Sequence, residues 1–69
     1  MIILKNLVYN FRKKKRLTQE DLARLVGVTR QTIISIEQGK YIASLPLALK
    51  FAKIFETSVE EIFQLEEGE

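Results

Sequence analysis

Apolar residues recur at three- and four-residue steps along most of the chain, which is the spacing of amphipathic helices. The clearest case begins at Thr18, where Thr18-x-x-Asp21 has the spacing of a capping box and Gly27 is placed to end the helix. A second short helix is expected from a cap at Thr29 to a stop at Gly39. The inward-facing positions of the pair are Leu22, Ala23, Val26, Ile33 and Ile36. This pattern predicts two short helices joined by a tight glycine turn.

Three further helices are predicted around this pair. Asn6–Lys14 carries apolar residues at helical spacing, with Asn6 available as a cap. Ser44 caps a fourth helix with Pro46 in its first turn, and Ser58-x-x-Glu61 opens a short fifth one. The core stripe of the fourth helix is interpreted as Leu45, Ala48, Phe51, Ala52 and Phe55.

The ends of the chain are candidates for short strands, at Ile2–Leu4 and Phe63–Leu65. No linker, repeat or low-complexity segment interrupts the pattern, so we expect one domain over residues 1–69. A core of this size is marginal unless it is well packed or shared with a partner.

The charge distribution is more informative than the net charge of +2. All 11 basic residues precede residue 56, whereas the last 14 residues carry six glutamates and no Lys or Arg. This uneven distribution has two interpretations. The charges either belong to ordinary solvated helix faces, or they form a basic surface that binds a polyanion and an acidic end that faces away from it. The basic run Arg12–Arg16, directly before the helix pair, favours the second interpretation.

Several kinds of chemistry find little support in the composition. The chain has no cysteine and no histidine, so thiolate sites, disulfides and histidine ligands or bases are excluded. The six tail glutamates lack the spacing of a calcium loop, and no apolar run approaches membrane-spanning length. We therefore expect a cytoplasmic protein that is not an enzyme, with no cofactor, no metal and no evident small-molecule effector.

The helix pair itself is typical of a helix-turn-helix, in which the second helix enters a DNA groove. Ala23 is small enough to let the second helix cross the first. The outward positions of the second helix include Arg30, Gln31 and Ser35. Ile34 is also expected to face outward, where it would touch a thymine methyl or cover neighbouring side chains.

The segment TQEDLARLVGVTRQTIISIEQGKY resembles the helix-turn-helix of the phage-repressor-like (xenobiotic-response-element type) transcriptional regulators. The similarity extends through SLPLALKFAKIF and SVEEIF. It implies an all-α, five-helix lambda-repressor-like bundle with the motif at about residues 18–38. In small stand-alone dimeric members the chain termini pair as a two-stranded antiparallel sheet, which would suit the two strand candidates here.

The resemblance also implies roles for individual residues. In the major groove, an arginine can form two hydrogen bonds with guanine, and a glutamine can form two with adenine. The implied base contacts are Arg30, Gln31 and Ser35. The implied contacts to the DNA backbone are Gln19, Thr29, Gln38 and Lys40, joined by Lys13 and Lys14 from the basic run. Arg12 and Glu37 match a structural salt bridge of the family, which places Arg12 in the scaffold rather than on the DNA.

Three positions depart from the family pattern. Arg16 and Glu56 stand where glycine is usual, so we expect left-handed conformations that are strained for these side chains. Ile42 puts an apolar residue in the loop after the second motif helix, which weakens the expectation that this loop contacts phosphate.

The function expected from these observations is a sequence-specific double-stranded DNA-binding transcriptional regulator, most simply a repressor. Operators of this kind are usually pseudo-palindromes read by dimers. Leu47, Ile54 and Leu65 are left over once one core is filled, so they are candidates for a homodimer interface. The alternative is an antitoxin-like or partner-binding module on the same fold.

Overall fold

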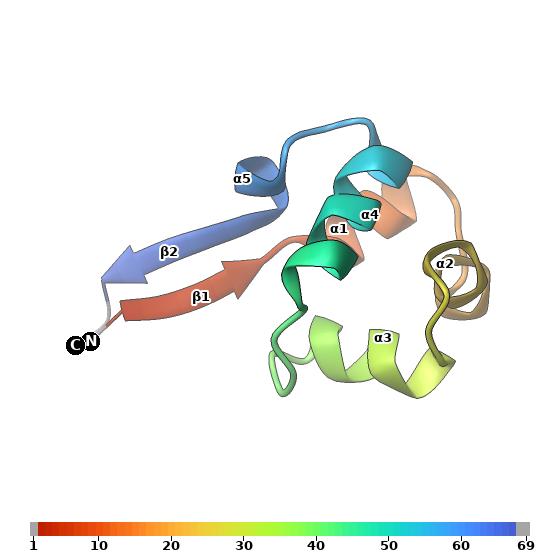
Figure 1. The fold of residues 1–69 in the computed structure, drawn as a ribbon, viewed down its shortest axis with the longest axis horizontal. Helices are drawn as coiled ribbons and strands as arrows, with labels where there is room; N and C mark the ends of the chain where they lie inside the picture. Colours follow the sequence, from red (N-terminus) through yellow and green to blue (C-terminus); the bar gives the residue numbers. More distant parts are fainter. Residues whose placement is uncertain (1, 68–69) are drawn as a thin grey trace.

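The computed structural model describes residues 2–67, which form five helices and a two-stranded antiparallel sheet (Figure 1). The elements in chain order are β1 (Ile2–Asn6), α1 (Val8–Lys14), α2 (Gln19–Val26), α3 (Arg30–Glu37), α4 (Leu45–Phe55), α5 (Val59–Ile62) and β2 (Phe63–Glu67). The predicted five-helix architecture is therefore present. The fold is mostly helical but not purely all-α, because the two ends of the described chain pair as a sheet.

The helices begin where short polar side chains satisfy their free backbone amides. Thr18 accepts a hydrogen bond from the Asp21 amide while the Asp21 carboxylate accepts one from the Thr18 amide, so the predicted capping box is complete. Thr29, Ser44 and Ser58 each accept a bond from the amide three residues later. These local contacts explain why the starts of α2 to α5 could be read from sequence.

The start of α1 was predicted incorrectly. Asn6 belongs to β1, and the helix begins at Val8 with Leu7 in the cap position. Asn6 still caps from outside the helix, because its Oδ1 accepts a bond from the Val8 amide at 3.2 Å. Its Nδ2 donates to the Ile36 carbonyl at 2.9 Å, which ties the end of β1 to α3.

The strands β1 and β2 form a ribbon that projects from the helical body (Figure 1). They pair in register from Ile2 with Glu67 to Asn6 with Phe63, which makes each strand longer than its predicted three residues. The Leu7 amide also donates to the Ile62 carbonyl at 2.8 Å, at the point where the ribbon joins the helices.

The core lies between the helices and contains the inward residues of the α2–α3 pair. Its largest fully buried side chains are Phe51, Leu22, Ile33, Ile36, Ile62, Val8 and Val26. Phe55 stacks on Phe11 and on Phe51, with ring centroids 5.5 and 5.9 Å apart, so aromatic packing joins α1 to α4.

The predicted core stripe of α4 was wrong in its first turn. Leu45 is 68% exposed, whereas Leu47 is only 7% exposed and belongs to the core. At about 100° per residue, Leu47 lies within about 40° of Phe51 on the helix, while Leu45 lies about 120° away. Leu47 is therefore a core residue, and the prediction that it is left over once the core is filled is wrong.

Arg16 and Glu56 both adopt the left-handed conformation expected from the sequence, with φ of 58° and 55°. Each follows a helix end, where a left-handed residue redirects the chain. The Lys15 ammonium forms an ion pair with the Glu56 carboxylate, so the two chain reversals are joined. This ion pair holds the pKa of Glu56 below its ordinary value, because the hydrogen bond and the charge of Lys15 both favour the carboxylate.

Candidate nucleic-acid interface

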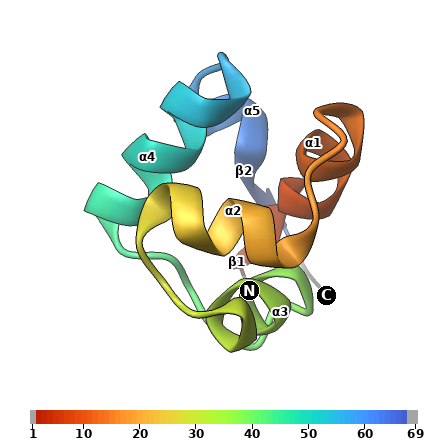
Figure 2. The same ribbon diagram turned by 90° about the vertical axis from the view of Figure 1, so that its right-hand side faces the viewer.

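The α2–α3 pair has the geometry of a helix-turn-helix. Gly27 ends α2 with φ of 77°, and the Val28 amide bonds back to the Ala23 carbonyl at 2.9 Å. Ala23 is buried between the helices, so its small side chain permits their close approach. Figure 1 shows α2 nearly end-on while α3 lies in the plane of the view, so the two helices cross. Figure 2, turned by 90°, places α3 along the edge of the helical body.

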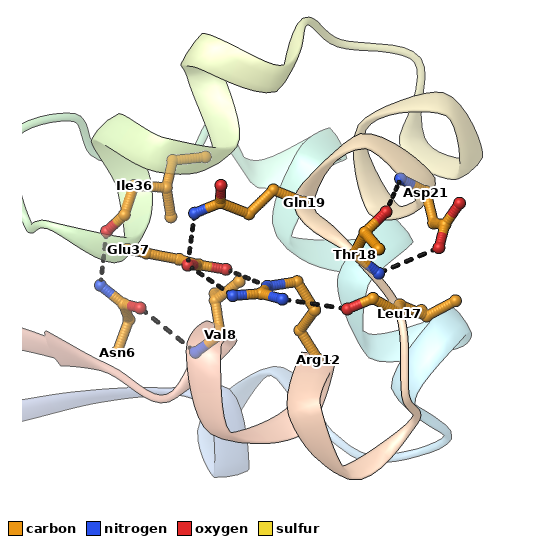
Figure 3. Close-up of polar contacts among 9 residues, drawn as sticks. All are labelled: Asn6, Val8, Arg12, Leu17, Thr18, Gln19, Asp21, Ile36 and Glu37. Atoms are coloured by element: carbon orange, nitrogen blue, oxygen red, sulfur yellow. Dashed lines mark hydrogen bonds and ion pairs between the residues drawn. The ribbon is translucent and has the colours of Figure 1, made fainter.

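A buried polar cluster holds α3 against α1 and α2 (Figure 3). Arg12 donates from Nε to Glu37 Oε2 at 2.7 Å and from Nη2 to Glu37 Oε1 at 3.2 Å. Its Nη1 donates to the Leu17 carbonyl at 2.9 Å. The ion pair between α1 and α3 that the family resemblance implied is therefore present, and Arg12 is occupied by the scaffold.

Gln19 joins the same cluster from the first turn of α2. Its Nε2 donates to Glu37 Oε1 at 3.2 Å, and the side chain is half-buried (Figure 3). An amide nitrogen carries two donors, so one N–H of Gln19 is committed to Glu37 and the other can serve a further acceptor. Three helices thus meet at one carboxylate, which fixes the orientation of α3.

The outer face of α3 carries the three residues implied to contact bases. Arg30 and Gln31 are exposed, and Ser35 is half-buried. Gln31 Nε2 lies 3.5 Å from Ser35 Oγ, at the outer limit of a hydrogen bond. Both polar groups are therefore free to exchange this contact for another partner. Ile34 is half-buried, so it covers neighbouring side chains in part.

Apart from Gln19, the residues implied to contact the DNA backbone fall into two groups. Thr29, Gln38 and Lys40 are exposed at the two ends of α3, and Thr29 and Lys40 line one hollow together with Gln31 and Ser35. Lys13 and Lys14 lie at the C-terminal end of α1. Figures 1 and 2 place that end beside the end of α4, on the side of the helical body opposite α3.

The contacts of Lys14 agree with this placement, because Lys14 lines a hollow of about 430 Å³ with Lys15, Phe55 and Glu56. The Lys13 ammonium lies 6.0 Å from the Tyr9 ring centroid, and the Arg12 guanidinium lies against the same ring. The structure therefore does not bring Lys14 together with the other backbone-contact candidates.

A shallow hollow of about 290 Å³ runs along one flank of α3. It is lined by Thr29, Gln31, Thr32, Ser35, Lys40 and Tyr41. Thr32 was not among the residues predicted to contact DNA, and Tyr41 was not identified from the sequence. The i, i+3 spacing of Thr29, Thr32 and Ser35 could have indicated a polar ridge, but nothing in the sequence places Tyr41 against that ridge.

The three residues predicted for a homodimer interface differ in exposure. Leu47 is buried in the core, Ile54 is half-buried against it, and Leu65 is 72% exposed on the ribbon. Leu65 pairs with Leu4 across the sheet, so the two leucines lie on the same face of the ribbon. Of the predicted set, Leu65 is thus the residue with most of its apolar surface still exposed to solvent.

Comparison with known proteins assigns the fold to a family. A family model described as helix-turn-helix matches residues 8–62. The chain belongs to this helix-turn-helix family. An uncharacterized HTH-type transcriptional regulator of Methanocaldococcus jannaschii is 53% identical over 66 residues, which cover 96% of this chain and 100% of the relative. The uncharacterized HTH-type transcriptional regulator YgzD of Bacillus subtilis is 48% identical over 64 residues, which cover 93% of this chain and 97% of the relative.

Solved structures of helix-turn-helix proteins share the architecture. The restriction-modification controller protein C.AhdI from Aeromonas hydrophila has a TM-score of 0.72 at 33% identity, over 78% of this chain and 82% of that one. The clp gene regulator ClgR from Corynebacterium glutamicum has a TM-score of 0.73 at 24% identity, over 78% and 57% of the two chains, so it supports the fold alone. Within residues 2–67, none of the helices has the length and apolar character required to span a membrane.

Proposed function

We propose that this helix-turn-helix protein is a sequence-specific double-stranded DNA-binding transcriptional regulator that places α3 in the major groove. The observation that carries the proposal is the contrast between the two sides of α3. Its inner side is locked by Ile33, Ile36 and Glu37, while its outer side presents Arg30 and Gln31 with no strong internal partner among the described residues. A rigid helix with uncommitted polar side chains suits direct reading of base edges.

In this proposal Arg30 and Gln31 read bases, and Ser35 adds a contact one turn later. The weak Gln31–Ser35 bond at 3.5 Å leaves both side chains available when bases approach. Gln19, Thr29, Gln38 and Lys40 contact the phosphates that border the groove. Gln19 would use its second N–H for this contact, while its first stays on Glu37.

Lys13 and Lys14 have a different part in the proposal. They lie at the end of α1, on the side opposite α3, so they raise the general attraction for DNA rather than touch the same phosphates. The regulatory outcome proposed is repression, because a protein bound over a promoter occludes it.

The test combines a selection of bound duplexes from random DNA with two alanine variants. Arg30→Ala should cost about 1–3 kcal/mol on the selected duplex and relax its base preference. Lys40→Ala should weaken binding to selected and random duplexes alike, and reduce the log–log salt slope by about 0.9. If Arg30→Ala weakened both duplexes equally, the base-reading role of Arg30 would be wrong.

We further propose that the protein acts as a homodimer that uses the apolar face of the ribbon. Leu4 and Leu65 lie opposite each other there, and a two-stranded ribbon is marginally stable unless something packs against it. Leu65→Asp should increase the monomer fraction in sedimentation experiments at micromolar concentration, whereas Leu49→Asp, on the exposed side of α4, should not. A wild-type protein that sediments as a monomer would exclude this assembly.

A further inference from the structure

The hollow along the flank of α3 gathers hydrogen-bond donors from the helix and from the loop that follows it. Building on the proposed DNA-binding function, we propose that this hollow binds a phosphate of the DNA backbone, and that Tyr41 is a DNA-binding residue that donates its hydroxyl to that phosphate. Thr29, Thr32 and Lys40 complete the donor set. The hollow, at about 290 Å³, is open to solvent, which suits a phosphate that stays attached to a duplex.

The two threonines leave one hydroxyl proton unused. Thr29 Oγ1 accepts a bond from the Thr32 amide at 3.3 Å, and the two hydroxyl oxygens lie 3.0 Å apart. Only one of the two hydroxyls can donate to the other, so the remaining hydroxyl has its proton free for an acceptor outside the protein. An anionic oxygen is the acceptor that such a proton binds most strongly.

The chain reversal after α3 brings the other two donors to the same flank. Gly39 has φ of 75°, and the Lys40 amide bonds back to the Ser35 carbonyl at 2.9 Å. Lys40 and Tyr41 therefore follow the end of α3 closely rather than leading away from it. Among the described residues, the ion pairs involve other cations, so the Lys40 ammonium has no carboxylate within ion-pair distance.

The position of the hollow on the helix favours phosphate over a base. A major groove is about 12 Å wide, close to the roughly 10–12 Å diameter of a helix with its side chains. The outer face of a helix in that groove meets base edges, and its flanks meet the two backbones. Gln31 and Ser35 form the side of the hollow next to the base-reading face. Its far wall, Lys40 and Tyr41, comes from the loop rather than from α3, so the hollow extends from that face toward one flank.

The test is Tyr41→Phe, which removes one oxygen, with Tyr9→Phe as the matched control. Both tyrosines are 51% exposed, but Tyr9 lies on α1 near Arg12 and Lys13. Tyr41→Phe should weaken binding about five- to tenfold, equally on the selected duplex and on a random duplex, since a phosphate contact carries no sequence information. The salt slope should stay unchanged because tyrosine is neutral. Tyr9→Phe should bind as the wild type does.

Ethylation of single phosphates tests directly whether Tyr41 contacts the DNA backbone. On the selected duplex, ethylation of one backbone position should weaken the wild type but have little further effect on Tyr41→Phe. A purely structural role of the hydroxyl would lower the melting temperature and leave this ethylation pattern unchanged, which would overturn the inference.

The outcomes also separate this inference from the proposed function. If the wild type binds and Tyr41→Phe binds equally well, the inference is wrong and the proposed function stands. If the wild type prefers no sequence but Tyr41→Phe still weakens binding, the inference stands and sequence-specific reading is wrong. A wild type that binds no duplex at all overturns both.

Discussion

Removal of the Glu37 carboxylate should destabilise the protein more than any change to a surface charge. The Arg12 and Glu37 side chains are only 8% and 7% exposed, and the carboxylate accepts two bonds from Arg12 and one from Gln19. In Glu37→Ala the guanidinium stays buried without a counter-charge. The Leu17 carbonyl still accepts one of its bonds, so the guanidinium keeps part of its coordination.

Breaking a buried pair from one side typically costs about 3–5 kcal/mol, and the surviving Leu17 bond places the expected loss near the lower end, at about 3 kcal/mol. A chain of this length has a total stability of roughly 3–10 kcal/mol. The loss is therefore a large part of the total, and corresponds to a fall in Tm of about 12–24 °C.

Urea unfolding followed by circular dichroism measures this loss, with protein concentration held constant because association would shift the midpoint. Glu66→Ala is the control, since its pair with Lys5 is 3.5 Å long with side chains 52% and 53% exposed, and it should cost less than about 1 kcal/mol. The double variant Arg12→Met/Glu37→Leu should recover at least half of the loss, because it leaves no buried charge. A cost below about 1 kcal/mol for Glu37→Ala, or a double variant worse than the single one, would refute the reasoning.

Three further predictions concern the helix ends. The backbone and hydroxyl bonds of Thr18, with a smaller contribution from Arg24, lower the pKa of Asp21 below its ordinary value of 3.8. The capping box therefore stabilises the fold above that ordinary value, and this stabilisation is lost as the pH falls through the lowered pKa. Asp21→Asn should remove that part of the acid sensitivity in urea midpoints measured from neutral to acidic pH, and an unchanged pH profile would contradict it. Arg16→Gly should raise the free energy of unfolding by about 0.5–1 kcal/mol, because φ of 58° is strained for arginine. Gly27→Ala should lower the free energy of unfolding by about 1 kcal/mol, because an alanine is strained at φ of 77°. The added Cβ would meet nothing within 4 Å, so no clash adds to this cost. A neutral result in thermal melts would argue against strain at that turn.

The local parts of this fold could be predicted from sequence because their causes lie within a few residues. Thr18, Thr29, Ser44 and Ser58 cap their helices through bonds three residues away, and Gly27 ends α2 because glycine tolerates a left-handed conformation. The left-handed conformations of Arg16 and Glu56 followed from the family pattern rather than from local chemistry. The helix caps and Gly27 therefore predict the helix-turn-helix without knowledge of any tertiary contact.

The core face of α4 could be predicted only in part. Helical periodicity places Leu47, rather than Leu45, on the same face as Phe51, but it does not say which face of the helix turns inward. Packing against the rest of the core selects Leu47 and leaves Leu45 exposed. The length of the β1–β2 ribbon was decided in the same way, because pairing between the two ends of the chain extends both strands beyond their apolar residues.

The five helix-forming segments, the glycine turn and the polar residues of α3 can thus be recognised from local sequence patterns. Which of those residues share a surface depends on the tertiary fold. Lys14 and Lys40 look alike in a list of basic residues, but folding puts Lys14 beside Glu56 at the far end of α1 and Lys40 beside Tyr41 on the flank of α3. Contacts between residues distant in the chain depend on the packing of whole helices, and no local pattern encodes them.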